Sequence, residues 1–180
     1  MEKLTRLLDR PVVLVGLMGA GKSTVGKRLA KRLGLEFVDS DVAIEDAAGA
    51  TTSEIFARYG EADFRDGEKR LVARLIDGTV RIIATGGGAF NDPDTRALLN
   101  AHSVTVWLDA PIAVLAQRTG LRDNRPMLKG GNRAQKLQAL MDERIAYYSE
   151  AHIHIRNETE GSHAEVVDAV IAALLKRFGA

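Results

Sequence analysis

The sequence predicts an α/β fold in which a parallel sheet is covered by helices on both faces. Three observations predict it: short apolar runs such as "PVVLV" (11–15), amphipathic helical segments between these runs, and a glycine-rich segment directly after the first run. The first run is short and rich in β-branched residues, which is typical of a buried strand. Strands that alternate with helices along a chain are typical of a parallel sheet between two helical layers.

The first half of the chain is expected to contain strands and helices in alternation. In the first helix, Val25, Leu29 and Leu33 recur at intervals of four residues and form one apolar stripe, which Gly34 ends. Gly78 is expected to end the last helix of this half. The expected strands are 11–15, 36–38 and 80–85, and the expected helices are 22–33, 41–49, 53–59 and 61–77.

The second half continues the alternation. One helix is expected after Pro93 and another from Pro111 to about Thr119, because proline favours the first turn of a helix. The segment 119–131, "TGLRDNRPMLKGG", is irregular and charged and is too short to be a domain. We therefore expect a single domain over 1–180. The remaining expected strands are 104–108 and 152–155, and the remaining expected helices are 132–150 and 163–178.

The composition narrows the range of functions. The chain has 25 basic and 24 acidic side chains and a net charge of +1, which argues against broad electrostatic binding to nucleic acid or to an anionic membrane. Without cysteine it forms neither disulfides nor thiolate metal sites. The N-terminal segment lacks an apolar signal core, and no apolar run reaches membrane-spanning length. We therefore expect a cytoplasmic protein without nucleic-acid or membrane partners, and the near-zero charge favours a monomer.

A glycine-rich segment, "GLMGAGKST" (16–24), directly follows the first expected strand. Its spacing, Gly16-x-x-x-x-Gly21-Lys22-Ser23, matches the P-loop pattern in full. In such a loop, backbone N–H groups surround a phosphate, Lys22 would reach the β- and γ-phosphates, and Ser23 would bind Mg²⁺. The helix that follows favours the anion at its N-terminus. The pattern predicts a nucleoside triphosphate site, whose expected residues are Gly19, Ala20, Gly21, Lys22, Ser23 and Thr24.

A P-loop alone does not separate a kinase from a GTPase or a motor ATPase. A GTPase would need the guanine-specifying N-K-x-D, which is absent, and "DAAG" (46–49) lies in a stretch expected to be helical. A motor ATPase would carry a catalytic Glu after the acid that ends a hydrophobic strand, but no Glu follows Asp109. The sequence therefore favours a use of the triphosphate other than that of a GTPase or a motor ATPase.

Two further features follow the ends of expected strands, so a parallel sheet would bring them to the same edge as the P-loop. Asp39 and Asp41, in "VDSD", are two residues apart, and both carboxylates can face the same way. One could hold Mg²⁺ through water while the other accepts a hydrogen bond or a proton from a substrate hydroxyl, or either could cap the next helix. The second feature is a run of three glycines, Gly86, Gly87 and Gly88, directly after the strand expected at 80–85. Glycines without side chains expose backbone N–H groups and permit close approach of a ligand.

Several arginines are candidates for binding an anionic group. A guanidinium is the natural partner of a carboxylate or a phosphate, although any single one is more often a solvated surface charge. From the residues alone we predict a small-molecule phosphotransferase with a polar or anionic acceptor. The candidate arginines are Arg65, Arg118, Arg122, Arg125 and Arg144.

Six segments together, in order over residues 11–150, resemble the shikimate kinase family. The resemblance implies a P-loop fold of the nucleoside-monophosphate-kinase type, with three layers and a five-stranded parallel sheet in the order 2-3-1-4-5. It also implies phosphorylation of the 3-hydroxyl of shikimate by ATP with Mg²⁺, in the pathway to chorismate and aromatic amino acids. The segments are "GLMGAGKST", "FVDSDVAIE", "IFARYGEADFRDGE", "TGGGA", "RTGLRDNRP" and "MDERIAYY".

The resemblance implies roles for residues on the acceptor side. Asp41 matches the acid that binds the acceptor hydroxyls and acts as the base. Arg65 and Arg144 match the arginines that hold the shikimate carboxylate, and Gly86–Gly88 matches the glycine-rich substrate loop. The helices within about 41–77 would then form the substrate-binding part of the domain.

The resemblance also implies roles on the nucleotide side. Lys22 and Arg125 would offset charge on the transferring phosphoryl group, and Arg118 matches the arginine that packs on adenine. Arg125 lies in 119–131, which would be a lid that closes over the phosphates and excludes water. The expected metal ligands are Ser23 and Asp39, with Asp109 as the alternative to Asp39.

Two other functions stay open on the sequence. One is a kinase for another small acceptor, such as gluconate or a nucleoside monophosphate. The other is an ATP-dependent binding or regulatory module without catalysis, which would bind ATP but show no turnover stimulated by an acceptor. In that module Asp41→Asn would have no effect.

Overall fold

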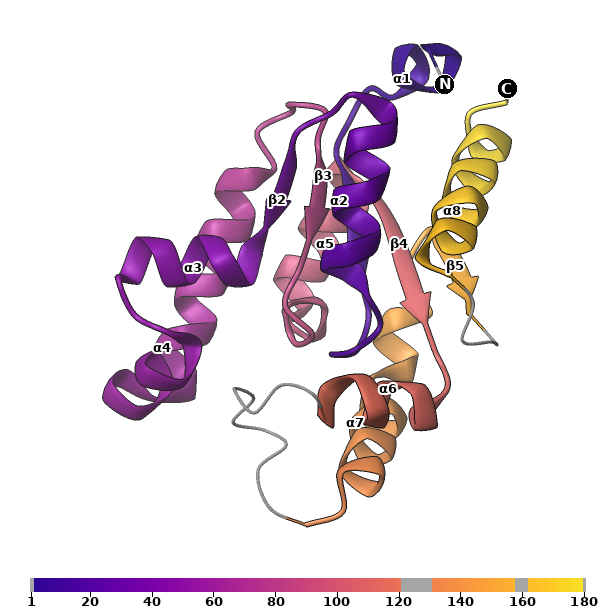
Figure 1. The fold of residues 1–180 in the computed structure, drawn as a ribbon. Coiled ribbons are helices and arrows are strands. Elements are labelled where there is room, and N and C mark those ends of the chain that lie inside the picture. Colours follow the sequence, from indigo (N-terminus) through magenta and orange to yellow (C-terminus); the bar gives the residue numbers. More distant parts are fainter. Residues whose placement is uncertain (1, 121–130, 158–161, 180) are drawn as a thin grey trace.

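The computed structural model describes residues 2–120, 131–157 and 162–179, and it shows five parallel strands between layers of helices (Figure 1). The strand order is β2-β3-β1-β4-β5. The predicted α/β class, the three layers and the strand order are confirmed. The strands are β1 (Val12–Val15), β2 (Phe37–Asp39), β3 (Ile82–Ala84), β4 (Val104–Asp109) and β5 (Ile153–Arg156).

The central strand β1 is buried along its whole length, as its unbroken apolar sequence predicts. Val13 pairs with Ile83 of β3 on one side and with Thr105 of β4 on the other. Because every pair in the sheet is parallel, the carboxyl ends of all strands lie at one edge. This edge is where the candidate residues after β1, β2 and β3 meet.

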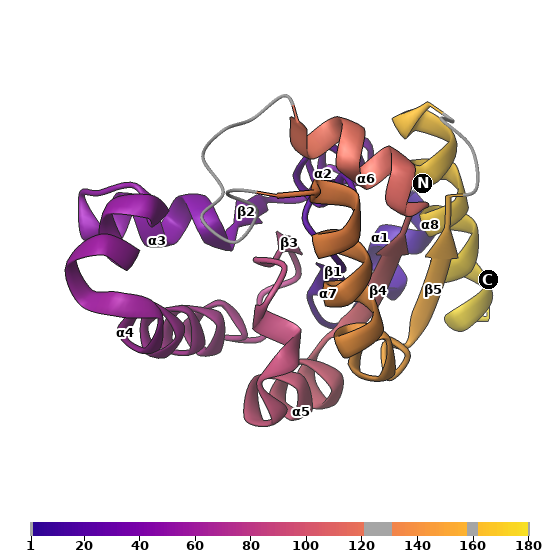
Figure 2. The same cartoon turned by 90° about the horizontal axis from the view of Figure 1, so that it is seen from below.

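The helices take up three positions around the sheet. In the view along the strands (Figure 2), α2 and α8 lie on one face and α5 on the other, whereas α3 and α4 extend beyond the β2 edge. Figure 1 shows α6 and α7 below the carboxyl ends of the strands. The helices are α1 (Glu2–Leu7), α2 (Lys22–Leu33), α3 (Ser40–Ala48), α4 (Thr52–Leu75), α5 (Pro93–His102), α6 (Ile112–Gly120), α7 (Arg133–Tyr148) and α8 (His163–Arg177), with a 3₁₀ turn, η1, at Ala89–Asn91.

Helix α4 contains the two helices expected at 53–59 and 61–77. It begins with a capping box, in which Thr51 and Glu54 bind each other's backbone N–H groups. Gly60 interrupts it with φ 86° and ψ 173°, a conformation that favours glycine, and the helix ends at Leu75 rather than at 77. Around α3 and α4 a small apolar cluster, separate from the main core, contains Ile44, Ile55 and Phe64.

Helix α1 is absent from the sequence-based expectations. It has only six residues, too few for a visible helical period, and it is held by Leu4 and Leu8, which are buried in the main core. Among the described residues, no helix has the length and apolar character needed to cross a membrane. Of the segment expected to form a lid, residues 121–130 lie outside the described part of the chain.

Candidate active site

The loop after β1, Gly16–Ser23, is called the phosphate loop below. Glycine is required at Gly16, where φ is 134° and a Cβ would collide with the carbonyl oxygen of Leu108. At the end of the loop, the buried Lys22 donates hydrogen bonds from Nζ to the carbonyl oxygens of Gly16 at 2.7 Å and Leu17 at 3.0 Å. The loop therefore curls around its own lysine, with the N-terminus of α2 directly behind it.

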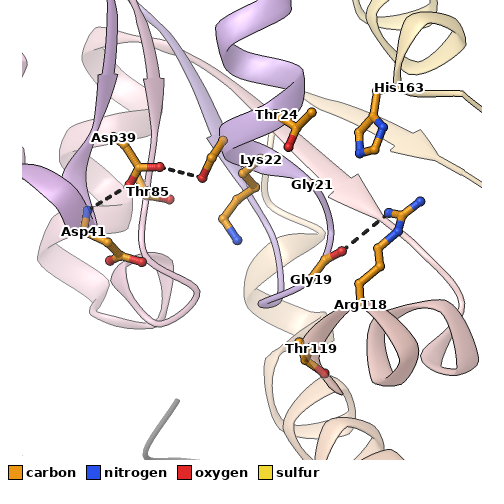
Figure 3. Close-up of a pocket in the computed structure, with 11 residues that line it drawn as sticks. Gly19, Gly21, Lys22, Thr24, Asp39, Asp41, Thr85, Arg118, Thr119 and His163 are labelled. Atoms are coloured by element: carbon orange, nitrogen blue, oxygen red, sulfur yellow. Dashed lines mark hydrogen bonds between the residues drawn. The ribbon is translucent and has the colours of Figure 1, made fainter. Parts of the chain in front are cut away.

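A pocket opens in front of this loop and is called the phosphate-loop pocket. In Figure 3, Asp39 and Asp41 lie on one side of Lys22, and Arg118 and His163 lie on the other. Arg118 reaches the carbonyl oxygen of Gly19 through Nη1 at 3.5 Å. Lys22 and Arg118 thus face a space that Asp39 and Asp41 border on one side. Such an arrangement suits a chain of phosphates that carries a metal ion. The pocket is lined by Gly19, Gly21, Lys22, Ser23, Thr24, Asp39, Asp41, Thr85, Arg118, Thr119 and His163.

Asp39 makes two contacts, one of which is the helix cap that the sequence allowed. Its Oδ1 accepts a hydrogen bond from the backbone N–H of Asp41 at 3.1 Å and so caps α3. Its Oδ2 accepts a hydrogen bond from the hydroxyl of Ser23 at 2.5 Å (Figure 3). The two candidate metal ligands are therefore in contact, and their oxygens are the donors that Mg²⁺ prefers, so this pair fits the ion.

Asp109, the alternative metal ligand, lies elsewhere. It ends β4, its Oδ2 is 3.2 Å from Nε2 of His154, and it is not among the residues that line the phosphate-loop pocket. Within the described part of the chain, no group of three or more His, Asp or Glu side chains is placed to hold a metal ion. The Ser23–Asp39 pair would thus rely on phosphate and water for its other ligands.

The segment Gly86–Gly88 follows β3 and is called the triple-glycine loop. A Cβ at Gly86 would lie 2.6 Å from Oδ1 of Asp41, and a Cβ at Gly88 would lie 2.6 Å from Nη1 of Arg65. Neither residue has a positive φ. A Cβ at either position would therefore displace side chains of the candidate site, and the backbone conformation itself does not require glycine.

A second pocket, called the arginine pocket, contains both arginines expected to bind a carboxylate. Arg65 of α4 and Arg144 of α7 line it together with Gly88. The side chain of Arg144 is only 4% exposed, and its Nε has no hydrogen-bond partner among the described residues, the nearest carboxylate oxygen being that of Glu143 at 3.9 Å. A buried guanidinium with an unused donor favours an anionic ligand.

Glu68 is the second charged group buried at this pocket. Its Oε2 accepts a hydrogen bond from Nη1 of Arg65 at 2.7 Å, whereas its Oε1 is buried and has no partner within the described residues. Burial raises the pKa of the Glu68 carboxyl, the ion pair with Arg65 opposes this, and the negative charge of Asp41 adds to it. The carboxylate thus orients Arg65 while keeping one oxygen toward the site.

The two pockets meet at Gly86. A Cβ at Gly86 would lie 2.6 Å from Oδ1 of Asp41, which lines the phosphate-loop pocket, and 2.5 Å from Oε1 of Glu68, which lines the arginine pocket. On the other side, Gly87 packs on the phosphate loop, because its Cβ would be 3.2 Å from the backbone nitrogen of Met18. The arrangement can hold an anion and a triphosphate on either side of one carboxylate, Asp41.

Most of the residues singled out in the sequence lie in these two pockets. Ala20 belongs to the phosphate loop but does not line its pocket, and its N–H donates to the carbonyl oxygen of Leu17 at 3.2 Å. Arg122 and Arg125 lie outside the described residues. Two residues that line the pockets, Glu68 and His163, are not among the candidates that the sequence predicts. Glu68 stands three residues after Arg65, which is a readable signal, whereas nothing in the sequence marks His163.

His163 is the first residue of α8 and lies beside the phosphate loop. A Cβ at Gly21 would be 3.6 Å from its ring, and 3.8 Å from Nη1 of Arg118. Burial and the positive charges of Arg118 and Arg28 lower the pKa of His163. A neutral imidazole therefore borders the pocket at neutral pH.

The family model and the relatives similar in sequence agree on one family. A family model for shikimate kinase matches residues 18–175. The chain is 50% identical over 164 residues to a shikimate kinase of Paramagnetospirillum magneticum, covering 91% of this chain and 84% of that protein. It is 47% identical over 173 residues to one of Caulobacter vibrioides, covering 96% and 86%. A shikimate kinase from Acinetobacter baumannii, solved in complex with shikimate, matches with a TM-score of 0.90 and 36% identity, covering 96% of this chain and 98% of that chain.

Proposed function

The chain belongs to the shikimate kinase family, and we propose that its two pockets hold the two substrates, ATP at the phosphate loop and shikimate in the arginine pocket. The enzyme transfers the γ-phosphoryl group of ATP to the 3-hydroxyl of shikimate, with Mg²⁺, and gives shikimate 3-phosphate and ADP. The reaction belongs to the biosynthesis of aromatic amino acids.

The observation that carries the proposal is the junction at Gly86. Asp41 lies there between the pocket of the phosphate loop and the pocket that contains Arg65 and Arg144. Phosphoryl transfer needs an acceptor hydroxyl aligned with the terminal phosphate and little covalent chemistry from the protein. A carboxylate at the junction of the two pockets is placed to align that hydroxyl.

On the acceptor side, Arg65 and Arg144 hold the carboxylate of shikimate, and Glu68 holds the guanidinium of Arg65 through its hydrogen bond. The N–H group of Gly86 donates to the hydroxyl of Ser40 at 3.0 Å, so the triple-glycine loop would offer the N–H groups of Gly87 and Gly88 to the ring hydroxyls. Asp41 accepts the hydrogen bond of the reacting hydroxyl and takes its proton as the phosphoryl group arrives. Holding the carboxylate at the far end determines which hydroxyl of the ring faces Asp41.

On the nucleotide side, the phosphate loop from Gly19 to Thr24 surrounds the phosphates, and Lys22 offsets charge on the group in transfer. Arg118 contacts the carbonyl oxygen of Gly19 in the phosphate loop. In this proposal it also packs on the adenine of ATP. Ser23 and Asp39 would hold Mg²⁺, directly or through water, and the bound ion supplies positive charge against the β- and γ-phosphates.

Further parts of the proposal concern the chain as a whole. We propose a single kinase domain over 1–180, with acceptor-binding helices within 41–77 and a lid at 119–131 that brings Arg125 to the phosphates. We also propose that the enzyme works as a monomer in the cytoplasm. Light scattering after size-exclusion chromatography tests the monomer, and cell fractionation tests the location.

A coupled assay of ADP formation with a panel of acceptors tests the function. Shikimate should stimulate ADP formation strongly, whereas gluconate and nucleoside monophosphates should not, because neither offers a carboxylate and a ring hydroxyl with the spacing of the two pockets. Asp41→Asn should abolish the stimulation while leaving ATP binding intact. Stimulation by another acceptor alone, or full activity of Asp41→Asn, would overturn the assignment.

A further inference from the structure

The hydroxyl of Tyr148 contacts the triple-glycine loop and has no role in the assignments above. Tyr148 is the last residue of α7, and its side chain is fully buried. The hydroxyl donates a hydrogen bond to the carbonyl oxygen of Gly87 at 2.6 Å. A buried hydroxyl requires a partner, and here that partner is a backbone atom of the loop that faces both pockets.

The ring of Tyr148 is held by two aromatic neighbours. It stacks on Trp107 of β4, with ring centroids 5.7 Å apart and planes at 25°. It also stacks on Phe90, which follows the triple-glycine loop, with centroids 6.5 Å apart and planes at 11°. Because these neighbours restrict the ring, the hydroxyl has a defined position relative to Gly87.

Gly87 connects the two pockets through its own contacts. Its carbonyl oxygen accepts a second hydrogen bond, from Nη1 of Arg144 at 3.2 Å. A Cβ on it would lie 3.2 Å from the backbone nitrogen of Met18, in the phosphate loop. A shift of this one peptide therefore moves a guanidinium of the arginine pocket relative to the phosphate loop.

We propose that Tyr148 is a positioning residue for phosphoryl transfer, whose hydroxyl holds Gly87 so that the arginine pocket keeps its place against the phosphate loop. The inference rests on the proposed function, because it takes Arg144 and the triple-glycine loop to be the binding site of the acceptor. Tyr148 lines neither pocket, so it acts through Gly87 and Arg144. Small displacements in such a supporting contact are enough to misalign reacting groups.

The hydroxyl of Tyr148 stays protonated and so remains a hydrogen-bond donor at the pH of enzyme assays. Burial raises its pKa to about 12, while the positive charges of Arg144 and Arg65 act in the opposite direction and Glu143 adds to the rise. The hydroxyl therefore keeps its proton throughout the range of enzyme assays. The effect of removing it should be the same at every pH between about 6 and 9.

Tyr148→Phe tests the inference, because it removes the hydroxyl and keeps the ring. Tyr147→Phe is the matched control: it removes the hydroxyl of the neighbouring tyrosine, whose ring packs on Arg96 instead. In steady-state kinetics, Tyr148→Phe should raise the KM for shikimate about five- to tenfold, the effect of one buried hydrogen bond, and lower kcat. The KM for ATP should stay unchanged, and the control should match the wild type.

The outcomes separate positioning from support of the fold. A lower melting temperature of Tyr148→Phe with an unchanged KM for shikimate would show a purely structural role and overturn the inference. Phe90→Leu keeps the hydroxyl but loosens the ring, so it should raise the same KM by less; an unchanged KM there contradicts the inference even if Tyr148→Phe does not fold. Wild-type enzyme without shikimate-stimulated ADP formation would instead overturn the proposed function.

Discussion

The phosphate loop and the triple-glycine loop lie side by side at one edge of the sheet, and both depend on glycine, but for different reasons. In the phosphate loop, Gly16, Gly19 and Gly21 have φ values of 134°, 85° and 91°. These are backbone conformations that a residue with a Cβ adopts only with strain. There the glycines shape the chain so that it can curl around a phosphate.

In the triple-glycine loop no residue has a positive φ, and Gly88 has φ −104°. At Gly86 and Gly88, side chains of the site approach so closely that a Cβ would displace them; these side chains are Asp41, Glu68 and Arg65. The backbone of this loop thus packs directly against side chains of the proposed acceptor site. The difference predicts that substitutions in the first loop act through the backbone, and that substitutions in the second act by displacing side chains that bind the acceptor.

The largest effect is expected at the phosphate loop. Lys22→Ala removes the only ammonium group that this loop contributes, so kcat should fall by about 10³-fold or more. Lys27→Ala, at an exposed position of the same helix, is the control and should be silent. The Kd for shikimate, measured by calorimetry without nucleotide, should stay unchanged in both variants. A Lys22→Ala enzyme with near-normal turnover would remove the phosphate loop from the mechanism.

The next largest effect is expected in the arginine pocket. Arg65→Ala and Arg144→Ala should each weaken shikimate binding by about 2–4 kcal/mol, the range for leaving a carboxylate unpaired, without changing the Kd for ATP. Arg70→Ala, an exposed arginine on α4, is the control. Calorimetric titration of each folded variant measures both constants. If both variants kept wild-type affinity for shikimate, this pocket would not be the acceptor site.

Gly86→Ala tests the triple-glycine loop directly. The new methyl group would displace Asp41 and Glu68, and we expect the KM for shikimate to rise about 10- to 100-fold, as for other misplacements of aligned groups. Gly67→Ala is the control, because a Cβ there has no neighbour within 4 Å. Kinetics and a melting curve of each variant give the comparison. An unchanged KM in Gly86→Ala would mean that the close approach has no function.

Gly21→Ala tests the backbone argument in the phosphate loop. The atom nearest to its Cβ would be 3.6 Å away, so the substitution causes no collision. The positive φ alone should lower the free energy of unfolding by about 1–2 kcal/mol. Gly34→Ala, at the other end of α2, also has a positive φ with open space around it. Denaturant unfolding should show similar losses in both, while only Gly21→Ala raises the KM for ATP. An equal KM for ATP in the two variants would contradict the role of the phosphate-loop backbone in binding ATP.

The smallest effect concerns the carboxyl of Glu68. Burial raises its pKa in the folded protein above the ordinary value of 4.5, so the folded state binds more protons than the unfolded state between these two values. The free energy of unfolding therefore falls as the pH rises through that window. Glu68→Gln, which keeps an oxygen for Arg65, lacks this loss, and its stability relative to wild type should increase from pH 4.5 upward and then level off. Denaturant unfolding of both proteins at several pH values measures this difference, and a variant that loses stability relative to wild type as the pH rises would contradict the direction of the shift.

The sequence predicts the phosphate loop better than it predicts the arginine pocket. The spacing from Gly16 to Ser23 is local, so the strand, the loop and the helix can be assigned from one segment. The sequence allows Asp39 either to cap a helix or to bind a metal ion, and in the structure it caps α3 and also contacts Ser23. Sequence spacing does not reveal that one carboxylate can make both contacts, because Ser23 follows a different strand.

The residues that the sequence did not reveal are those brought in by long-range packing. His163 borders the phosphate loop because α8 packs on α2, and Tyr148 reaches Gly87 because α7 crosses the ends of the strands. Glu68 is visible in "FRDGE" beside Arg65, but its burial depends on the contact of α4 with the triple-glycine loop. Charge and spacing identify such residues as candidates, and only the fold shows which of them face the site.

A crystal structure with shikimate, ADP and Mg²⁺ tests the central claim most directly. We expect the shikimate carboxylate between Arg65 and Arg144, a ring hydroxyl on Asp41 next to Gly86, and the ADP phosphates in the phosphate loop. Shikimate bound away from the triple-glycine loop, or with its carboxylate toward the phosphate loop, would contradict the account.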